Sequence, residues 1–361
     1  MYEKYDQYDC GGSGDYYDSY MNEQLLSAKK SFSRASLSLV FYLIVSNAAV
    51  LIGQLVMIAL LGLEEANALF TENILITYLF NVVSQYVIAF PVLYLILRPI
   101  KRVRCEGEKM TGKEFVLAFL ISQAFMQAGS IIGEALNSAI GAFLGGEITN
   151  DVSDMIMDTP IWLVILVVVV IGPIFEELIF RKLLFDRLSR YGTKLTIVVT
   201  SIAFGLFHGN LYQLFYAAAL GLVLGFIYAK TRNLIYPIAM HILINLFGTL
   251  PALLLDDTLN SIDTLLEALA SGTEININDY VFDLLIFGAY SFISSSLVIA
   301  GIITLIICIR NKKISVRETC EFKLPRDRAL STAVSNVGTI IFLIIIMLTV
   351  ILNLLPAELI Q

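Results

Sequence analysis

The chain has 361 residues, of which 57% are hydrophobic and 15% are charged, and its net charge is −7. Soluble domains carry roughly 45–50% apolar and about 25% charged residues, so this composition excludes an ordinary soluble enzyme, a secreted disulfide scaffold and a disordered protein. The acidic balance does not suggest binding to nucleic acid. The four cysteines follow neither a CxxC nor a zinc-ribbon spacing; they are Cys10, Cys105, Cys308 and Cys320. The composition is typical of a polytopic membrane protein.

The N-terminal 25 residues are acidic and rich in tyrosine. A segment of this kind buries too little apolar surface to fold by itself. It also lacks the apolar stretch of a cleavable signal peptide. We therefore expect residues 1–35 to form a disordered tail on the cytoplasmic side.

Apolar runs of the length that crosses a bilayer, about 20 residues, recur along the rest of the chain. Nine such runs lie near 37–62, 75–97, 115–144, 161–180, 195–208, 211–229, 234–255, 282–309 and 334–355. They are too long and too continuously apolar for barrel strands, which alternate over about ten residues. The fifth run is short, so eight spans is an alternative. The sequence predicts an all-α, polytopic bundle of transmembrane helices.

The positions of the charged residues predict the orientation of this bundle. All Lys and Arg residues fall into five segments, namely Lys4 to Arg34, Arg98 to Lys113, Arg181 to Lys194, Lys230 to Arg232 and Arg310 to Arg328. The loops between these segments carry acids, such as Glu64, Asp151, Asp154 and Asp256. Because basic residues collect in cytoplasmic loops, this alternation predicts nine spans, with the N-terminus inside and the C-terminus outside.

Few ionisable residues fall within the predicted spans, where each charge costs about 2.5–3.5 kcal/mol. They are Glu134, Glu176, Glu177, His208 and His241, and the chain has no other histidine. All but Glu134 lie in the predicted fourth, fifth and seventh spans. We therefore divide the membrane part into N-terminal helices (36–155), a catalytic core (156–255) and C-terminal helices (256–361).

Adjacent glutamates point about 100° apart on a helix, so Glu176 and Glu177 cannot face the same target. Glu177 and Arg181 are four residues apart in the favourable order for an ion pair. This spacing predicts that Arg181 neutralises Glu177 and leaves Glu176 available for proton chemistry. Pro173 removes one backbone hydrogen bond and is expected to kink the same helix.

The remaining polar residues are expected at the same depth as Glu176. If the fourth and fifth spans form a hairpin that turns at Gly192, Glu176 and His208 are equally far from the turn, so the two side chains should face each other. His241 and Asn245 share one face of the seventh span, at a depth of about 18 Å for Asn245.

These side chains have the chemistry needed to hydrolyse an amide. A carboxylate with an imidazole can hold and deprotonate a water molecule, and a second imidazole with an amide can stabilise an oxyanion. A zinc ion on Glu176, His208 and His241 is an alternative, since catalytic zinc takes three protein ligands. There is no HExxH helix.

The ordered set EExxxR, FxxxH and HxxxN in consecutive apolar helices resembles the CPBP (Abi) family of intramembrane proteases. That family includes the type II CAAX prenyl endopeptidases and bacteriocin self-immunity proteins. In this chain the motifs are Glu176-Glu177 with Arg181, Phe204 with His208, and His241 with Asn245. The resemblance covers only the predicted core and leaves the flanking spans unexplained.

The resemblance implies a role for each motif residue. Glu176 and His208 would activate the attacking water, and His241 with Asn245 would form the oxyanion site. Glu177 and Arg181 would support them, with Phe204 as packing. The family is often labelled metal-dependent, whereas its prenyl endopeptidases are also described as glutamate-dependent. We favour a mechanism that requires no cofactor and keep zinc as the alternative.

The leading hypothesis is therefore a multi-pass endopeptidase of a bacterial plasma membrane. Its partners would be the lipid bilayer and a protein or peptide substrate, with a CAAX-type prenylated protein as one option and no nucleic acid. A non-enzymatic protein that binds a bacteriocin or a membrane partner is the alternative. Glu134 would suit a transporter, but the repeats and broken helices of transporters are not evident.

Overall fold

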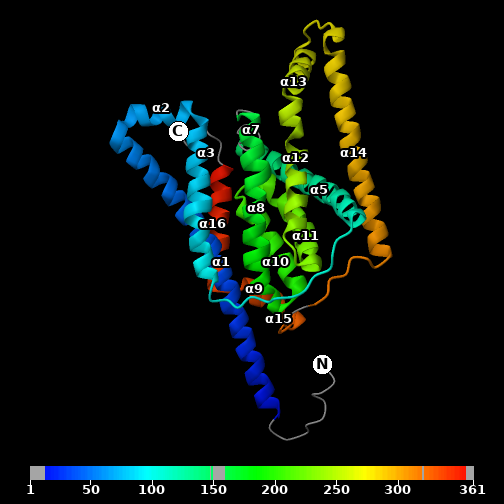
Figure 1. The fold of residues 1–361 in the computed structure, drawn as a ribbon. Helices are drawn as coiled ribbons and strands as arrows, with labels where there is room; N and C mark the ends of the chain where they lie inside the picture. Colours follow the sequence, from blue (N-terminus) through cyan, green and yellow to red (C-terminus); the bar gives the residue numbers. More distant parts are fainter. Residues whose placement is uncertain (1–12, 147, 149–158, 319–320, 355–361) are drawn as a thin grey trace.

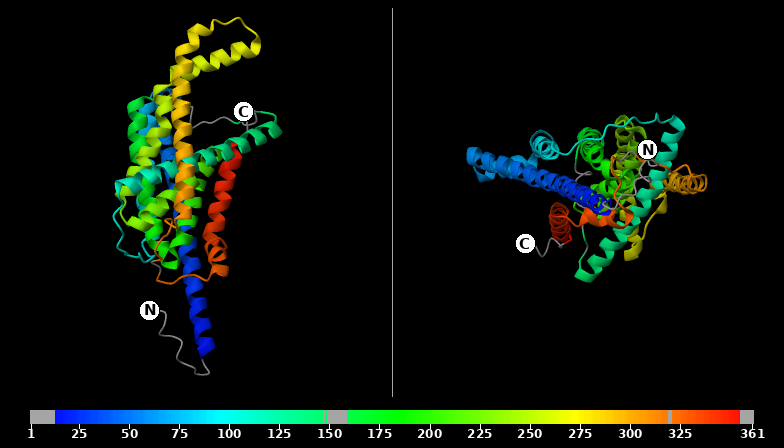
Figure 2. Two further views of the ribbon diagram at one scale, coloured as in Figure 1. Left: turned by 90° about the vertical axis from the view of Figure 1, so that its right-hand side faces the viewer. Right: turned by 90° about the horizontal axis from the view of Figure 1, so that it is seen from below.

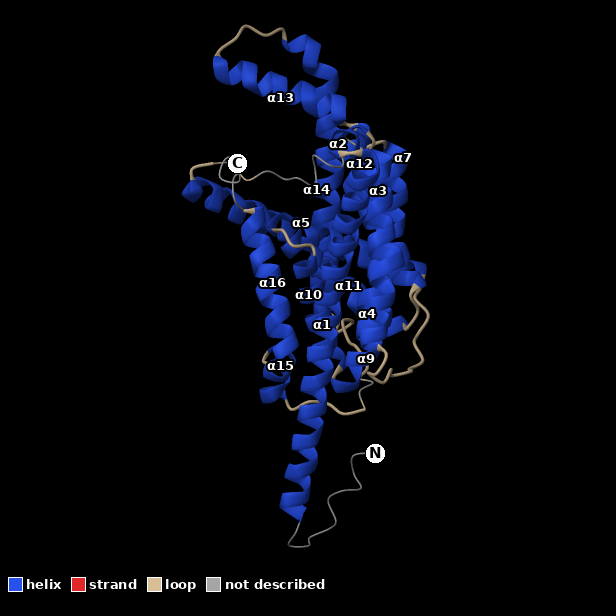
Figure 3. Cartoon of the chain, turned by 90° about the vertical axis from the view of Figure 1, so that its left-hand side faces the viewer, coloured by secondary structure: helices blue, strands red, loops and turns tan. Residues whose placement is uncertain are grey.

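The computed structural model describes residues 13–146, 148, 159–318 and 321–354. Most of these residues are helical, the rest form loops and turns, and no strand occurs among them (Figure 3). The longer helices are α1 (Ser13–Leu61), α5 (Gly112–Leu144), α10 (Thr193–Phe207), α11 (Leu211–Thr231), α12 (Ile235–Leu254), α13 (Asp256–Ser271), α14 (Val281–Arg310) and α16 (Val337–Asn353). The shorter ones are α2 (Leu63–Glu72), α3 (Ile74–Val82), α4 (Phe90–Leu97) and α15 (Arg326–Val334). The predicted all-α bundle is confirmed.

Two of the helices contain π-helical stretches. The π-helix η1 (Val83–Ala89) joins α3 to α4 without a break. The second continuous helix runs through α7 (Ile161–Val164), η2 (Ile165–Ile171), α8 (Gly172–Glu177), η3 (Leu178–Phe185), α9 (Asp186–Leu188) and η4 (Ser189–Tyr191), of which η2 and η3 are π-helical. Short π-helical segments often mark functional sites.

The described helices support a smaller number of complete spans than the nine predicted. Six are long and apolar enough to cross a membrane, and a seventh results if α15 and α16, bent by 59°, count as one. Two predicted spans correspond to the shorter apolar helices α10 and α12. With 15 residues, α10 measures about 22 Å, less than a typical hydrocarbon core of about 30 Å. The cytoplasmic N-terminus stays a prediction.

The predicted disordered tail differs from the structure over much of its length. Residues 13–35 belong to α1, whose first turns project below the bundle (Figure 1), whereas residues 1–12 lie outside the described residues. Tertiary contacts explain this helix. Phe32 is buried, and the hydroxyl of Ser31 lies 2.9 Å from that of Tyr191. The acidic loop residues Asp151 and Asp154 also lie outside the described residues.

The predicted core segment lies at the centre of the molecule. Helices α8, α10, α11 and α12 stand together, with α1, α3 and α16 on one side and α5 and α14 on the other (Figures 1 and 2). Helix α13 and the adjoining end of α14 project beyond the bundle, at the end opposite the start of α1 (Figures 1 and 2). The flanking helices therefore hold the core on both sides.

Glycines allow the central helices to pack closely. A methyl group on Gly221 of α11 would lie 3.0 Å from Cα of Ser201 on α10, and one on Gly225 would lie 3.4 Å from Cγ2 of Ile197. Small residues four apart typically bring membrane helices together in this way. This pair therefore allows α10 and α11 to approach closely.

Replacing Gly205 by alanine should destabilise the same interface. The new methyl group would overlap the backbone oxygen of Leu214 and lie 2.7 Å from Cβ of Ala218, so α10 and α11 would have to separate. We expect a loss of about 1–3 kcal/mol, as for other overpacked cores, measured by thermal unfolding in detergent. Gly248→Ala is the matched control, because that position has no neighbouring atom within 4 Å; equal stability of the two variants would contradict the prediction.

Candidate active site

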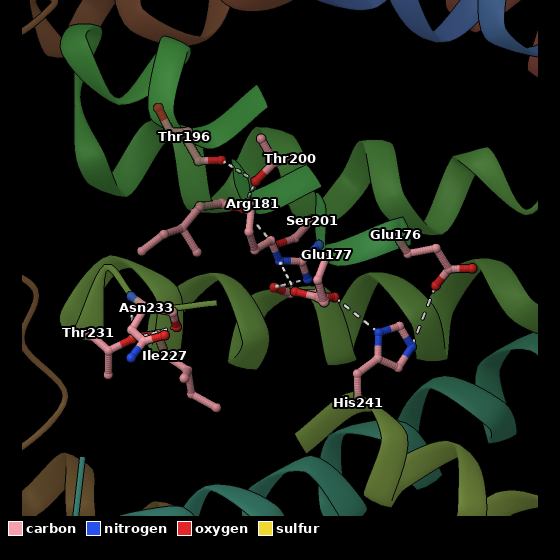
Figure 4. Close-up of polar contacts among 12 residues, drawn as sticks. Glu176, Glu177, Arg181, Thr196, Thr200, Ser201, Ile227, Thr231, Asn233 and His241 are labelled. Atoms are coloured by element: carbon pink, nitrogen blue, oxygen red, sulfur yellow. Dashed lines mark hydrogen bonds and ion pairs between the residues drawn. The ribbon is translucent and has the colours of Figure 1, made fainter. Parts of the chain in front are cut away.

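The site is built around α8, which carries the two adjacent glutamates between two π-helical stretches. Glu177 is completely buried, whereas the side chain of Glu176 is 29% exposed. The two carboxylates therefore point to different surroundings, as their adjacent positions on a helix require. Both nevertheless contact the same imidazole, that of His241 on α12 (Figure 4).

The buried carboxylate of Glu177 contacts two partners. Its Oε2 lies 3.1 Å from Nε of Arg181, as the spacing of these residues predicted. Its Oε1 lies 3.0 Å from Nδ1 of His241. An ionised carboxylate only accepts hydrogen bonds, so this contact places a proton on Nδ1 and fixes the orientation of the ring.

Arg181 is held on two further sides. Its Nη2 donates to the backbone oxygen of Gly221 at 3.4 Å, and its guanidinium lies 5.1 Å from the centroid of the Phe204 ring. The side chain is 1% exposed. A charge buried to this extent requires a partner of opposite charge, which Glu177 provides.

Glu176 lies on the other side of His241. Its Oε2 is 3.6 Å from Nε2 of the imidazole (Figure 4), beyond the usual range for a direct hydrogen bond. The imidazole of His241 thus has a carboxylate at each nitrogen, one in close contact and one at a distance.

His208 is held by the end of its own helix, and its predicted contact with Glu176 stays a prediction. The contact described for Glu176 is to His241. The Nδ1 of His208 lies 2.8 Å from the backbone oxygen of Phe204. His208 comes directly after the last residue of α10, so its ring folds back onto the end of its own helix. The equal arms of a hairpin predict depth, but not the direction in which a side chain points.

Phe204 connects the two histidines. Its ring meets that of His208 edge-on with centroids 5.0 Å apart, and that of His241 edge-on with centroids 5.7 Å apart. Phe204 is 1% exposed. The motif residue expected as packing therefore lies between the imidazoles and under the Arg181 guanidinium.

Asn245 has a structural partner that the sequence analysis missed. Its Nδ2 donates to the backbone oxygen of Val168 at 3.0 Å. Gly172 N–H bonds to Val167 instead, and Pro173 has no N–H. The carbonyl of Val168 thus lacks both the α-helical and the π-helical donor, and Asn245 replaces them. The position of Val168 relative to Pro173 was the feature of the sequence from which the bond of Asn245 to Val168 could have been expected.

Asn245→Ala should therefore destabilise the protein by leaving this partly buried carbonyl unpaired. We expect a loss of about 1–3 kcal/mol in thermal unfolding. In a Pro173→Ala background, the restored N–H can bond back along the helix, so the same substitution should cost less. Equal losses in the two backgrounds would show that Pro173 is not the reason for the Asn245 contact.

The residues named for a zinc ion do not fit that group as they are arranged. Among the described residues, no three His, Cys, Asp or Glu side chains gather closely enough to hold a metal ion. This spacing is what argues against zinc on Glu176, His208 and His241. The contacts of Nδ1 do not, because a metal-binding imidazole commonly donates from its other nitrogen to a carboxylate or a backbone oxygen.

Glu134 lies apart from this cluster. It is exposed on α5, whereas the cluster joins α8, η3, α10 and α12. The transporter that Glu134 would suit is not tested by this position.

Comparison with known proteins agrees with the motifs. Residues 158–247 match the family described as "Type II CAAX prenyl endopeptidase Rce1-like". The chain is similar to "Putative membrane peptidase YdiL" of Bacillus subtilis (strain 168), at 29% identity over 47% of this chain and 69% of that protein. It is also similar to "UPF0177 protein YxdF" of Lactococcus lactis subsp. lactis (strain IL1403), at 30% identity over 30% of this chain and 62% of that protein. No solved structure matches.

The matched residues contain the whole site, from Glu176 to Asn245. The apolar helices on either side make the chain an integral, multi-pass membrane protein, and both relatives are bacterial. The family model matched by residues 158–247 is thus that of the type II CAAX prenyl endopeptidases, in agreement with the CPBP family that the motifs of this segment resemble.

Proposed function

We propose that this protein is an intramembrane endopeptidase that hydrolyses a peptide bond of a membrane-associated protein or peptide. The observation that carries the proposal is His241 with a carboxylate at each ring nitrogen, one buried and paired with Arg181, the other partly exposed. The family of residues 158–247 supports peptide hydrolysis.

In this mechanism Glu176 is the general base. The carboxylate takes a proton from water, and the water oxygen attacks the carbonyl carbon of the scissile bond. Glu176 then passes the proton to the leaving amine as the C–N bond breaks. General acid–base catalysis of this kind contributes about 10²–10⁴-fold. His208, from the second motif, assists in holding the water.

His241 stabilises the oxyanion that forms during the attack. Because Nδ1 donates to Glu177, Nε2 can donate as well only when the imidazole is protonated. The positive ring then faces two carboxylates, and with Arg181 the four side chains sum to zero charge. A neutral cluster reduces the cost of burying these groups. The second N–H of Asn245, beside the one used by Val168, is available to the same oxyanion.

The family of residues 158–247 and the membrane support one substrate class. A CAAX-type protein whose prenyl group lies in the bilayer is the finer proposal, because the lipid would bring the peptide to the partly exposed Glu176. No metal is required in this mechanism.

Cleavage by the full chain in liposomes tests this proposal. Pairs of peptides would share one sequence and differ only in a farnesyl group on one cysteine, and products would be identified by mass spectrometry. We expect one new cleavage site, used faster in the prenylated peptide. If both peptides were cleaved at equal rates, the protein would be an endopeptidase without specificity for the prenyl group. Absence of products with both, from folded protein, would favour a binding protein.

A further inference from the structure

An aromatic residue outside the family segment lies beside the proposed base. Tyr86 is in η1, and its ring stacks on Phe175, the residue before Glu176, with centroids 4.1 Å apart and planes 19° apart. Phe90 meets the same Phe175 ring edge-on at 5.3 Å. Stacked rings hold each other in defined orientations, so the position of the Tyr86 ring is fixed relative to α8.

The hydroxyl of Tyr86 and the carboxylate of Glu176 border the same small space. A methyl group built on Gly172 would lie 3.8 Å from the Tyr86 hydroxyl oxygen and 4.0 Å from Oε1 of Glu176. Glycine leaves this space open between the two polar groups. The other carboxylate oxygen, Oε2, is the one that faces His241.

We propose that Tyr86 positions the Glu176 carboxylate, by donating its hydroxyl proton toward Oε1 directly or through one water molecule. The stack on Phe175 fixes the ring, and His241 faces Oε2, so the carboxylate is held from both sides. Tyr86 touches neither the scissile bond nor the attacking water and acts through Glu176. The kinetic consequence rests on the proposed function, whereas the contact itself does not.

Fluorine NMR tests the contact without any substrate. The full-length protein would carry 3-fluorotyrosine in place of Tyr86, or in place of the exposed Tyr94 on α4 as the control. We expect Glu176→Gln to shift the resonance at position 86 and to leave that at position 94 unchanged. Glu134→Gln should shift neither. If Glu176→Gln left the chemical shift at position 86 unchanged, the proposal would be overturned.

Kinetics then separate positioning from packing. Tyr86→Phe keeps the ring and removes only the hydroxyl, so kcat should fall about 10-fold, as for loss of a hydrogen bond to a charged group, with KM changed less than about twofold. Tyr94→Phe should leave both constants unchanged. Full activity in Tyr86→Phe would reduce Tyr86 to a packing residue. If the wild type cleaves no peptide, the proposed function fails, and the NMR result still decides the contact.

Discussion

Glu176→Gln is expected to lower kcat/KM for peptide cleavage by about 10³-fold or more while the protein stays folded. The substitution keeps the size of the side chain and removes the base, and a general base contributes about 10²–10⁴-fold. Little stability should be lost, because Glu176 is partly exposed and lies 3.6 Å from its imidazole partner. Cleavage rates and thermal unfolding on the same preparations measure the two effects.

Glu134→Gln is the matched control for this substitution. It also removes a carboxylate from a predicted span, but from the exposed face of α5, and should leave cleavage unchanged. If Glu134→Gln lost as much activity as Glu176→Gln, the loss would be caused by the changed charge of the membrane domain and not by removal of one general base. If Glu176→Gln stayed active, another group would have to take the proton.

The second large effect is expected from Arg181→Met, on stability. Arg181 is 1% exposed and Glu177 is completely buried, so the substitution leaves a negative charge without its partner in the core. Breaking a buried ion pair from one side typically costs about 3–5 kcal/mol. We expect a correspondingly lower unfolding temperature in detergent, together with loss of activity, because Glu177 also holds His241.

Removing both charges should restore part of this loss. In the double variant Arg181→Met with Glu177→Gln no charge is left unpaired, so its unfolding temperature should lie above that of Arg181→Met alone. Lys182→Met is the control, since Lys182 is 37% exposed and its partner Asp186 keeps Arg102 at 3.4 Å and the Tyr228 hydroxyl at 2.8 Å. This substitution should therefore cost little stability. A double variant no more stable than Arg181→Met would contradict a buried ion pair as the cause.

Much of the membrane architecture could be predicted because hydropathy depends only on the order of residues. Each of the nine apolar runs corresponds to helix in the structure. Their number as complete spans was less predictable, because α10, at about 22 Å, is shorter than a typical hydrocarbon core. Residues 13–35 show the other limit, since their helix depends on contacts with Tyr191 that are distant in sequence.

Which residues belong to the candidate site could be predicted better than the contacts between them. Spacing within one helix gave the pair of Glu177 with Arg181. Contacts between helices depend on how each helix is rotated about its axis, and the π-helical stretches η2 and η3 change that rotation around α8. For this reason the bonds of His241 to Glu177 and of Asn245 to Val168 could not be predicted from the sequence.

The most direct test of the central claim is peptide cleavage in liposomes by wild-type protein and by Glu176→Gln, each with and without a strong metal chelator. If Glu176 activates water without a metal, the wild type should cleave the peptide both with and without the chelator. Glu176→Gln should cleave it in neither condition. Cleavage by the variant, or loss of wild-type cleavage in the chelator that zinc restores, would contradict this account.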